Sequence, residues 1–536
     1  MNVSRRTLLG GSLAAAAVSL TGCSTVTRSD DIAALNKPVA LPTYKRFDGP
    51  KPDLPRSHPL MPDCFYRFPA DPQKVTSGVP GDGSEVAGST LTSNPIPPTA
   101  DRNKYWQELN RRLGSPLELT ITAATDYVNK FATSVAGDTL GDVFNVDGSF
   151  AYLPQFLEAR AQDLTEFLSG DAILEYPFLA NAPQASWRGC VFSGGIRAVP
   201  IQRGVMSSNT LLARQDLLDK LGVELGSPTV DELQKVAKAV TDGKKNRWGF
   251  AVPPTAAVSA MLGLPNGWEV RDGKLVHSRE LPEHKEMLAV TRQMVKDGTI
   301  HPDGVAKNNQ KVWFTQGSAV MTQDTYSSIQ SFYRRATDQD FNISIPVPRA
   351  DDGKVGRVLL GSPNNSIAAI RPGPPERTKL LLRMLNWMAA PFGTEEYLFR
   401  KFGLPGRHYT LNGTDPVLTK DGGSEVCLGE FPIQYLSDGP YPAYFPGHPE
   451  AVDTAYGHFK AVLPTAILPP TYGLYSPTQS TKGKILDTRM DSITKDIQLG
   501  RADLNSWDEA VADYRKAGAD AIRHEYEQAL AIQGRK

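Results

Sequence analysis

SEVAGSTLTSNPIPPTADRNKYWQELNRRLGSPLELTIT, residues 84–122, contains the pattern that decides the fold of this chain. It divides into a predicted strand over Ser84–Thr92, a predicted helix over Asp101–Leu113 that ends at Gly114, and a predicted strand over Leu117–Thr122. Strands that alternate with a helix through short connections are typical of an α/β sheet with parallel strand pairs. We therefore predict an α/β protein.

The same alternation continues through the rest of the chain. A helix is predicted over 126–136, and Asp142–Val146 reads as a buried strand. Thr229–Glu232 matches a capping box at the start of a helix, and Ser506–Glu509 matches a second one. Gly317–Met321 is predicted as a short buried strand. We find no internal repeat and no coiled-coil heptads.

The N-terminus has the features of an export signal. Arg5 and Arg6 precede an apolar run, Thr7–Leu20, that is too short to cross a bilayer. The paired arginines resemble a twin-arginine signal. Leu20–Cys23 resembles the lipobox of bacterial lipoproteins, in which the cysteine is acylated and becomes the mature N-terminus. We predict lipidation at Cys23, with a cleaved signal and an incidental cysteine as the alternative.

Composition limits the function classes. Lys plus Arg and Asp plus Glu both number 58, and this zero net charge argues against a nucleic-acid-binding protein. The 536 residues suffice for two or more lobes with substantial cores. There is no CxxC, which argues against a redox site and a zinc knuckle. Any disulfide among Cys64, Cys190 and Cys427 is left open.

A search for catalytic motifs finds none. The sequence lacks a G-x-S-x-G nucleophile elbow, an HExxH zinc helix and a Walker loop, so we assign no catalytic residue. Catalytic carboxylates of a glycosidase have no universal spacing, so an enzyme is not eliminated. Aromatic residues gather instead near predicted strand ends and turns, where they suit the C–H faces of a sugar: Tyr127, Phe150, Trp187, Trp248, Trp268, Trp313, Tyr326, Tyr472 and Tyr475. Core packing is the alternative role for each.

Several motifs occur in a shared order: Gly194–Pro200, Leu211–Gly222, Trp268–Lys274, Lys296–Asp303, Phe314–Met321 and Trp387–Tyr409. In that order they resemble the extracellular solute-binding lipoproteins of bacterial ABC sugar importers, family 1 type, with the aldouronate and oligosaccharide-binding branch nearest. The resemblance implies a periplasmic-binding-protein-like α/β fold. Two α/β lobes would be joined by a hinge, with the ligand cleft between them.

The resemblance also implies domain boundaries, which we place as follows: signal peptide 1–22; tether and extended Pro/Gly-rich segment 23–83, lying over the first lobe; lobe one 84–198 plus 349–388; lobe two 200–345 plus 390–536. The chain would cross between lobes near Pro200, Pro346–Pro348 and Pro391.

The sequence departs from the family at one loop. Relatives often carry a calcium-loop-like insert after the capping-box helix, but Thr241–Arg247 is short and basic here. Calcium needs 6 to 8 oxygen ligands, so we predict no metal at this loop.

Loops that follow strand ends line the cleft in this fold, so the resemblance yields ten candidate ligand contacts. They are Asn94, Tyr127, Asp147, Phe150, Gln202, Arg203, Asp324, Tyr326, Tyr472 and Tyr475. We rank Tyr326, Asp147 and Arg203 first. A structural role is the alternative for each residue.

Together these features predict a substrate-binding lipoprotein. It would capture an oligosaccharide outside the cell and deliver it to the permease subunits of an ABC importer, without a cofactor and as a monomer. A lipid at Cys23 would hold it on the outer face of the cytoplasmic membrane. The alternatives are a secreted carbohydrate-active enzyme, similar to a glycoside hydrolase, and a binding protein for a non-sugar ligand such as a peptide.

Overall fold

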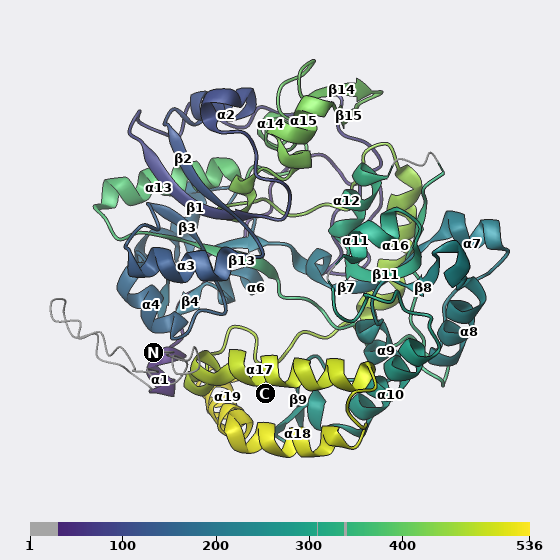
Figure 1. Ribbon diagram of the computed structural model, residues 1–536. Helices are drawn as coiled ribbons and strands as arrows, with labels where there is room; N and C mark the ends of the chain where they lie inside the picture. Colours follow the sequence, from purple (N-terminus) through teal and green to yellow (C-terminus); the bar gives the residue numbers. More distant parts are fainter. Residues whose placement is uncertain (1–30, 308, 337–339, 536) are drawn as a thin grey trace, which may run out of the picture.

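Two β-sheets form the centres of two α/β lobes, and a helical C-terminal unit lies below them in Figure 1. The structure is a computed structural model that describes residues 31–307, 309–336 and 340–535. The predicted signal peptide, 1–22, and the predicted lipidation site, Cys23, lie outside the described residues. The two sheets confirm the predicted α/β fold class.

The first lobe contains a five-stranded sheet. In spatial order its strands are β2 (Leu117–Ala123), β1 (Val86–Thr92), β3 (Val143–Val146), β13 (Asn364–Ile370) and β6 (Val199–Gln202). β1 pairs in parallel with β2 and β3, whereas β13 runs antiparallel to β3 and β6. The carboxyl ends of β1, β2, β3 and β6 therefore lie at one edge of the sheet, and β13 begins there.

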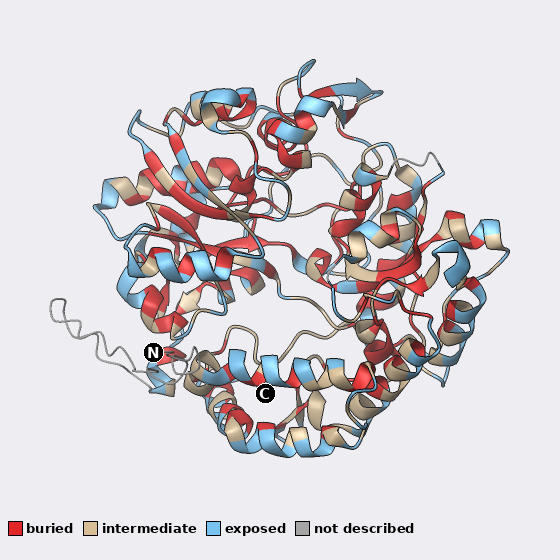
Figure 2. Cartoon of the chain, viewed as in Figure 1, coloured by how far each residue is buried: buried red, intermediate tan, exposed pale blue. Residues whose placement is uncertain are grey.

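Helices and two short hairpins complete the first lobe. The helices are α2 (Lys104–Leu113), α3 (Tyr127–Ala136), α4 (Leu153–Arg160), α5 (Thr165–Leu168), α6 (Gln184–Arg188), α13 (Pro375–Met388), α14 (Glu395–Phe402) and α15 (Lys420–Glu425). The hairpins are β4 (Val191–Phe192) with β5 (Gly195–Ile196), and β14 (Tyr409–Asn412) with β15 (Asp415–Leu418). Figure 2 shows the buried residues concentrated along the sheet and on the helix faces that cover it.

The second lobe is built on a four-stranded sheet. Its order is β12 (Ile343–Ser344), β7 (Asn209–Arg214), β11 (Ala319–Thr325) and β8 (Trp248–Phe250). Its helices are α7 (Gln215–Leu221), α8 (Val230–Val240), α9 (Thr255–Met261), α10 (Pro282–Lys296), α11 (Gln310–Thr315), α12 (Ser328–Arg335) and α16 (Pro449–Val462). The Thr229 hydroxyl accepts a hydrogen bond from the Glu232 backbone amide, and the Glu232 side chain accepts one from the Thr229 backbone amide. These two bonds confirm the capping box of α8.

The C-terminal unit packs its own apolar core against α10. It consists of α17 (Pro477–Gln498), α18 (Ser506–Tyr514), α19 (Asp520–Ile532) and the hairpin β9 (Trp268–Arg271) with β10 (Lys274–His277). The predicted capping box at Ser506–Glu509 is wrong. Ser506 is already the first helical residue, and the N-cap residue, Asn505, makes no side-chain cap bond because its backbone is helical.

The structure differs from the boundaries placed near Pro200 and Pro391. Pro200 lies inside β6, so the first crossing follows Gln202. Within residues 395–436, assigned to the second lobe, Phe399 and the apolar residues of 426–436 pack on the first core, while Tyr397, Phe402 and Tyr409 join a small separate cluster with the N-terminal segment. The reason is aromatic packing, because Phe399 of α14 stacks on Tyr105 of α2 at 4.9 Å between ring centroids. The last crossing to the second lobe follows residue 436.

The N-terminal segment 31–83, which we call the strap, touches both lobes. It begins with α1 (Ile32–Leu35), which packs on α19, and forms isolated bridges to Gly170 and Thr394 in the first lobe. Its Cys64 pairs with Ala443 and lies in the second lobe's core. The N-terminal segment is expected to lie over the first lobe. In the structure it contacts the second lobe as well.

Two further properties concern the thiols and the helices. Cys64, Cys190 and Cys427 are buried free thiols. Throughout residues 31–307, 309–336 and 340–535, no helix combines the length and the apolar composition that a bilayer span requires.

Candidate functional site

The candidate site lies where the strand ends of the first lobe meet the second lobe. Asn94 follows β1, Asp147 follows β3, and Gln202 is the last residue of β6. In open α/β sheets, ligands bind outside the carboxyl ends of the strands. On the second lobe, Asp324 lies near the end of β11. The topology thus brings polar side chains of both sheets to the interlobe region.

Asn94 makes a direct bond between the lobes. Its Oδ1 accepts from Nη2 of Arg335 on α12 at 2.8 Å. Its Nδ2 donates to Glu430 Oε2 at 2.7 Å and to the Cys427 carbonyl at 3.2 Å. The neighbouring Arg334 donates to the Leu428 carbonyl. Helix α12 therefore docks two guanidinium groups on the first lobe beside Asn94.

The turn that receives these contacts is strained. Cys427, Leu428 and Gly429 have φ of 53°, 57° and 81°, and the left-handed region is unfavourable for a residue such as leucine. Glycine is required at 429, because a Cβ there would lie 2.7 Å from both the Lys401 carbonyl and a guanidinium nitrogen of Arg334. Bonds from Asn94 and Arg334 to the carbonyls of this turn help to hold it in its strained form.

A buried ion cluster, which we call the Asp438 cluster, lies where the first and last crossings meet. Asp438 accepts from Arg203 Nη1 at 3.0 Å, Arg400 Nη1 at 2.9 Å and Lys401 Nζ at 3.2 Å. Burial alone would raise the pKa of Asp438, but the three cations hold it well below its usual range. Burial lowers the pKa of Lys401 to about 8, against the attraction of Asp438. The cluster ties the two crossings together through one carboxylate.

A cavity of about 590 Å³ adjoins this cluster. Its walls are residues of 44–65 from the strap, 202–205 from the first crossing, 391–392, 440–442 from the last crossing, and Asn181 and Pro183 of the first lobe. The Arg203 guanidinium lies over the Tyr441 ring at 4.9 Å. The volume is in the range of small-molecule sites, which occur preferentially at domain interfaces. Gln202 and Arg203, both predicted contacts, line this hinge cavity.

Asp324 has one carboxylate oxygen without a hydrogen-bond partner in the described part of the chain. Its Oδ1 accepts from the Thr325 amide at 2.7 Å and from the Ser328 hydroxyl at 2.6 Å. Its Oδ2 is buried and has no hydrogen-bond partner among the residues that the structure describes. A buried acceptor without a partner costs free energy unless a ligand donor satisfies it. Asp324 is therefore the predicted contact with the clearest unfilled hydrogen-bonding capacity.

The loop after β3 carries two predicted ligand contacts, Asp147 and Phe150, which have different surroundings. Asp147 is half-buried, and its Oδ1 accepts from the amide and hydroxyl of Ser149 at 3.0 and 2.9 Å. This bonding shapes the turn and leaves the other carboxylate oxygen for a ligand. Phe150 packs edge-to-face against Phe131 and Phe156 in the first core. Phe150 therefore has a structural role in this conformation.

Tyr326 and Tyr127 do not lie on the interlobe surface. Tyr326 has 0% exposure, and its hydroxyl bonds to His458 Nε2 at 2.8 Å. Tyr127 is 5% exposed, and its hydroxyl donates to the Asn145 carbonyl at 2.6 Å. Both rings are in the lobe cores because each finds a hydrogen-bond partner there. The structure thus corrects the placement of two residues predicted to contact ligand.

The last two predicted contacts lie where the chain enters the C-terminal unit. Tyr475 packs on Phe192 with ring centroids 4.7 Å apart, and its amide donates to Asn36 of the strap at 2.9 Å. Tyr472 lies against Gly189, and Arg535 donates to its carbonyl at 2.9 Å. These tyrosines join the first lobe to the strap and the C-terminal unit.

His458 makes the second lobe acid-sensitive. Burial lowers its pKa to about 4, below the unfolded value of about 6.5. Because protonation favours the unfolded chain, its contribution to stability is complete above pH ~6.5 and is lost as pH falls. Between pH 7 and pH 5 we expect a loss of about 2 kcal/mol from this residue. Denaturation at both pH values should show a smaller loss in His458→Gln, while His524→Gln, altered at an exposed histidine, should match wild type.

Sequence reasoning missed the residues that connect the lobes. Arg335, Glu430 and Asp438 belong to no recognised motif, and the motif Trp387–Tyr409, which contains Lys401, gives no indication of its role. The adjacent arginines at the end of α12 are the one local signal that could have identified part of the group. The other residues that connect the lobes come together only because residues 395–436 fold back onto the first lobe.

Comparisons with known proteins agree with this architecture. A family model described as bacterial extracellular solute-binding protein matches residues 105–397. The polygalacturonan/rhamnogalacturonan-binding protein YtcQ of Bacillus subtilis (strain 168) is 25% identical over 379 residues, which are 67% of this chain and 75% of that protein. Lipoprotein LipO of the same strain is 21% identical over 450 residues, 79% of this chain and 88% of its own.

Among solved structures, the alginate-binding protein AlgQ2 without calcium ion has the same overall fold. Its TM-score is 0.62 at 15% sequence identity, and the match covers 85% of this chain and 100% of AlgQ2. The likeness agrees with two α/β lobes connected by the chain crossings described above.

Proposed function

Because this chain belongs to the bacterial extracellular solute-binding protein family, we propose that it captures an oligosaccharide between its two lobes and delivers it to the permease of an ABC importer. The observations that support the proposal are the hydrogen bond between Asn94 and Arg335 across the lobes and the sheet topology, which leaves polar residues at strand ends of both sheets. Asn94 and Asp147 come from the first sheet, and Asp324 from the second. Ligand that contacts both sides favours the closed population, because it gains the second set of contacts only there.

The polar groups suit a saccharide. Carboxylates such as Asp324 accept hydrogen bonds from sugar hydroxyls, and guanidinium groups donate to ring and hydroxyl oxygens or to carboxylates. Arg334 and Arg335 enter the region from α12, and Arg203 lines the hinge cavity. A relative is named for binding polygalacturonan, a chain of sugar acids. Oligogalacturonides are therefore the first ligands to test.

The site residues proposed here are fewer than those predicted from the sequence. Asn94, Asp147 and Asp324 are proposed to contact the ligand directly, and Gln202 and Arg203 to line the hinge beside it. Tyr472 is proposed as a contact at the boundary with the C-terminal unit. The lobes proposed are built on the two sheets, with 395–436 in the first.

The location and the mode of action are also part of the proposal. Cys23 carries the lipid anchor after export through the twin-arginine route, and the strap leads from it to both lobes. The protein acts as a monomer and releases its ligand chemically unchanged. Kinship with a protein named as a lipoprotein supports the anchor.

Calorimetric titration with oligogalacturonides, beside neutral oligosaccharides of equal length, tests this function. We expect saturable 1:1 binding of at least one saccharide, and no release of new reducing ends on long incubation. Sustained release of reducing ends would favour the enzyme alternative. Failure of every saccharide, with binding of a peptide, would favour a non-sugar ligand.

A further inference from the structure

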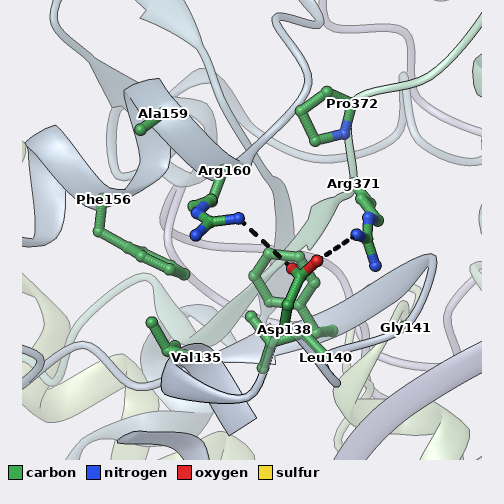
Figure 3. Close-up of a pocket in the computed structure, with 10 residues that line it drawn as sticks. Val135, Asp138, Leu140, Gly141, Phe156, Ala159, Arg160, Arg371 and Pro372 are labelled. Carbon is green, nitrogen blue, oxygen red and sulfur yellow. Dashed lines mark hydrogen bonds and ion pairs between the residues drawn. The ribbon is translucent and has the colours of Figure 1, made fainter. Parts of the chain in front are cut away.

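A separate cavity lies in the first lobe, at the end of the sheet opposite the strand ends that carry Asn94 and Asp147 (Figure 3). Gly141, which precedes β3, and Arg371, which follows β13, mark this end. The cavity has a volume of about 170 Å³. Its position places it outside the interlobe region, so a ligand there would not compete with the oligosaccharide.

The lining of the cavity is mixed, with an apolar part beside the charged groups of Asp138, Arg160 and Arg371. The apolar part is formed by Val135, Leu140, Phe144, Phe156, Ala159 and Pro372. Phe144 and Phe156 are buried and meet edge-to-face, with ring centroids 6.3 Å apart. A cavity of about 150 Å³ with apolar lining accommodates a benzene ring. The present cavity opens to solvent at its charged rim, and its volume is comparable to the space that one six-membered ring needs.

The rim is cationic. Arg160 Nη1 lies 3.4 Å from Asp138 Oδ1, and Arg371 Nη2 lies 2.6 Å from Asp138 Oδ2. Figure 3 shows the Asp138 carboxylate directed between the two guanidinium groups. Two cations face a single carboxylate, and each guanidinium has five donors, so hydrogen-bonding capacity remains for a second anion.

The ion pairs that hold the Asp138 carboxylate between Arg160 and Arg371 are weak. Its side chain is 56% exposed, and those of Arg160 and Arg371 are 54% and 46% exposed. Ion pairs this accessible to water contribute little to stability, because solvent screens them. An incoming carboxylate can therefore replace Asp138 at small cost. The arrangement resembles a site in which the chain's own carboxylate stands in for that of a ligand.

We propose that this cavity binds an aromatic monocarboxylate with a single ring. The ring lies against Phe144 and Phe156, and the carboxylate takes the place of the Asp138 side chain between Arg160 and Arg371. The inference goes beyond the proposed function and does not depend on it, since the two sites are at opposite ends of the first sheet.

Benzoate is the probe, titrated into the purified full-length protein by calorimetry. Acetate lacks the ring, benzyl alcohol lacks the charge, and galacturonate has a polar ring with the same charge. We expect saturable binding of benzoate and weaker binding of the other three. Failure of benzoate to saturate, or tighter binding of galacturonate, would overturn the proposal.

Variants distinguish binding of benzoate in this cavity from a general affinity of the protein for anions. Arg371→Gln should weaken benzoate binding by about tenfold or more, because a charge-assisted hydrogen bond is lost. Ala159→Phe, at an exposed position of α4, should abolish binding by filling the cavity while both arginines remain. Asp138→Asn should tighten binding by about two- to fivefold, because it removes the internal competitor.

Arg489→Gln is the matched control, since Arg489 forms an exposed ion pair with Asp513 at 3.0 Å in the C-terminal unit. Its affinity for benzoate should equal that of wild type. Equal binding by wild type, Arg371→Gln and Ala159→Phe would overturn the proposed site. Weaker binding by Asp138→Asn would contradict the role given to Asp138.

Discussion

Asp438→Asn should lower the free energy of unfolding by about 3 to 5 kcal/mol. The substitution leaves Arg203, Arg400 and Lys401 buried around a neutral amide. Removing one partner of a buried ion cluster is costly because Arg203 and Arg400 stay charged without a counter-ion, whereas Lys401 can lose its proton. Chemical denaturation followed by tryptophan fluorescence measures the loss.

Asp63→Asn provides a matched control for this effect. Asp63 also accepts from two arginines, Arg46 at 2.9 Å and Arg56 at 2.8 Å, but its side chain is 23% exposed and theirs are 48% and 33% exposed. We expect a loss below about 1 kcal/mol. Equal losses in the two variants would show that burial does not set the importance of Asp438.

Asp324→Asn should weaken oligosaccharide binding by about tenfold or more. Asparagine keeps an oxygen for the Thr325 and Ser328 donors, and it places an NH2 donor where the oxygen without a partner lies. A saccharide hydroxyl that donates to this oxygen in the wild type then meets a donor in place of a charged acceptor.

Titration calorimetry and denaturation of the same Asp324→Asn preparation test this expectation. Asp513→Asn, altered in the exposed pair with Arg489, should leave both measurements unchanged. Unaltered affinity in Asp324→Asn would remove Asp324 from the site. Reduced stability with unaltered affinity would assign it a purely structural role.

Local sequence patterns predicted the elements that depend on near neighbours. The strand–helix–strand order of residues 84–122 appears as β1, α2 and β2, and Gly114 ends α2 with φ of +69°. The capping box at Thr229 is present because its partner, Glu232, is three residues away. Such patterns carry their own hydrogen-bond partners, so they survive in any tertiary context.

Long-range packing determined what the sequence did not reveal. Tyr326 follows a strand end, as expected of a ligand contact, yet its ring turns into the core because His458 lies there to accept its bond. The assignment of 395–436 failed for a similar reason, since Phe399 finds its stacking partner 294 positions earlier, at Tyr105. The Asp438 cluster likewise joins residues that no local pattern connects.

The central claim is that the two lobes close around an oligosaccharide. Small-angle X-ray scattering of the protein, with and without the saccharide that calorimetry identifies, tests it most directly. We expect a smaller radius of gyration for the 1:1 complex, because ligand is contacted by both lobes at once. An unchanged radius of gyration at full saturation would contradict binding between closing lobes.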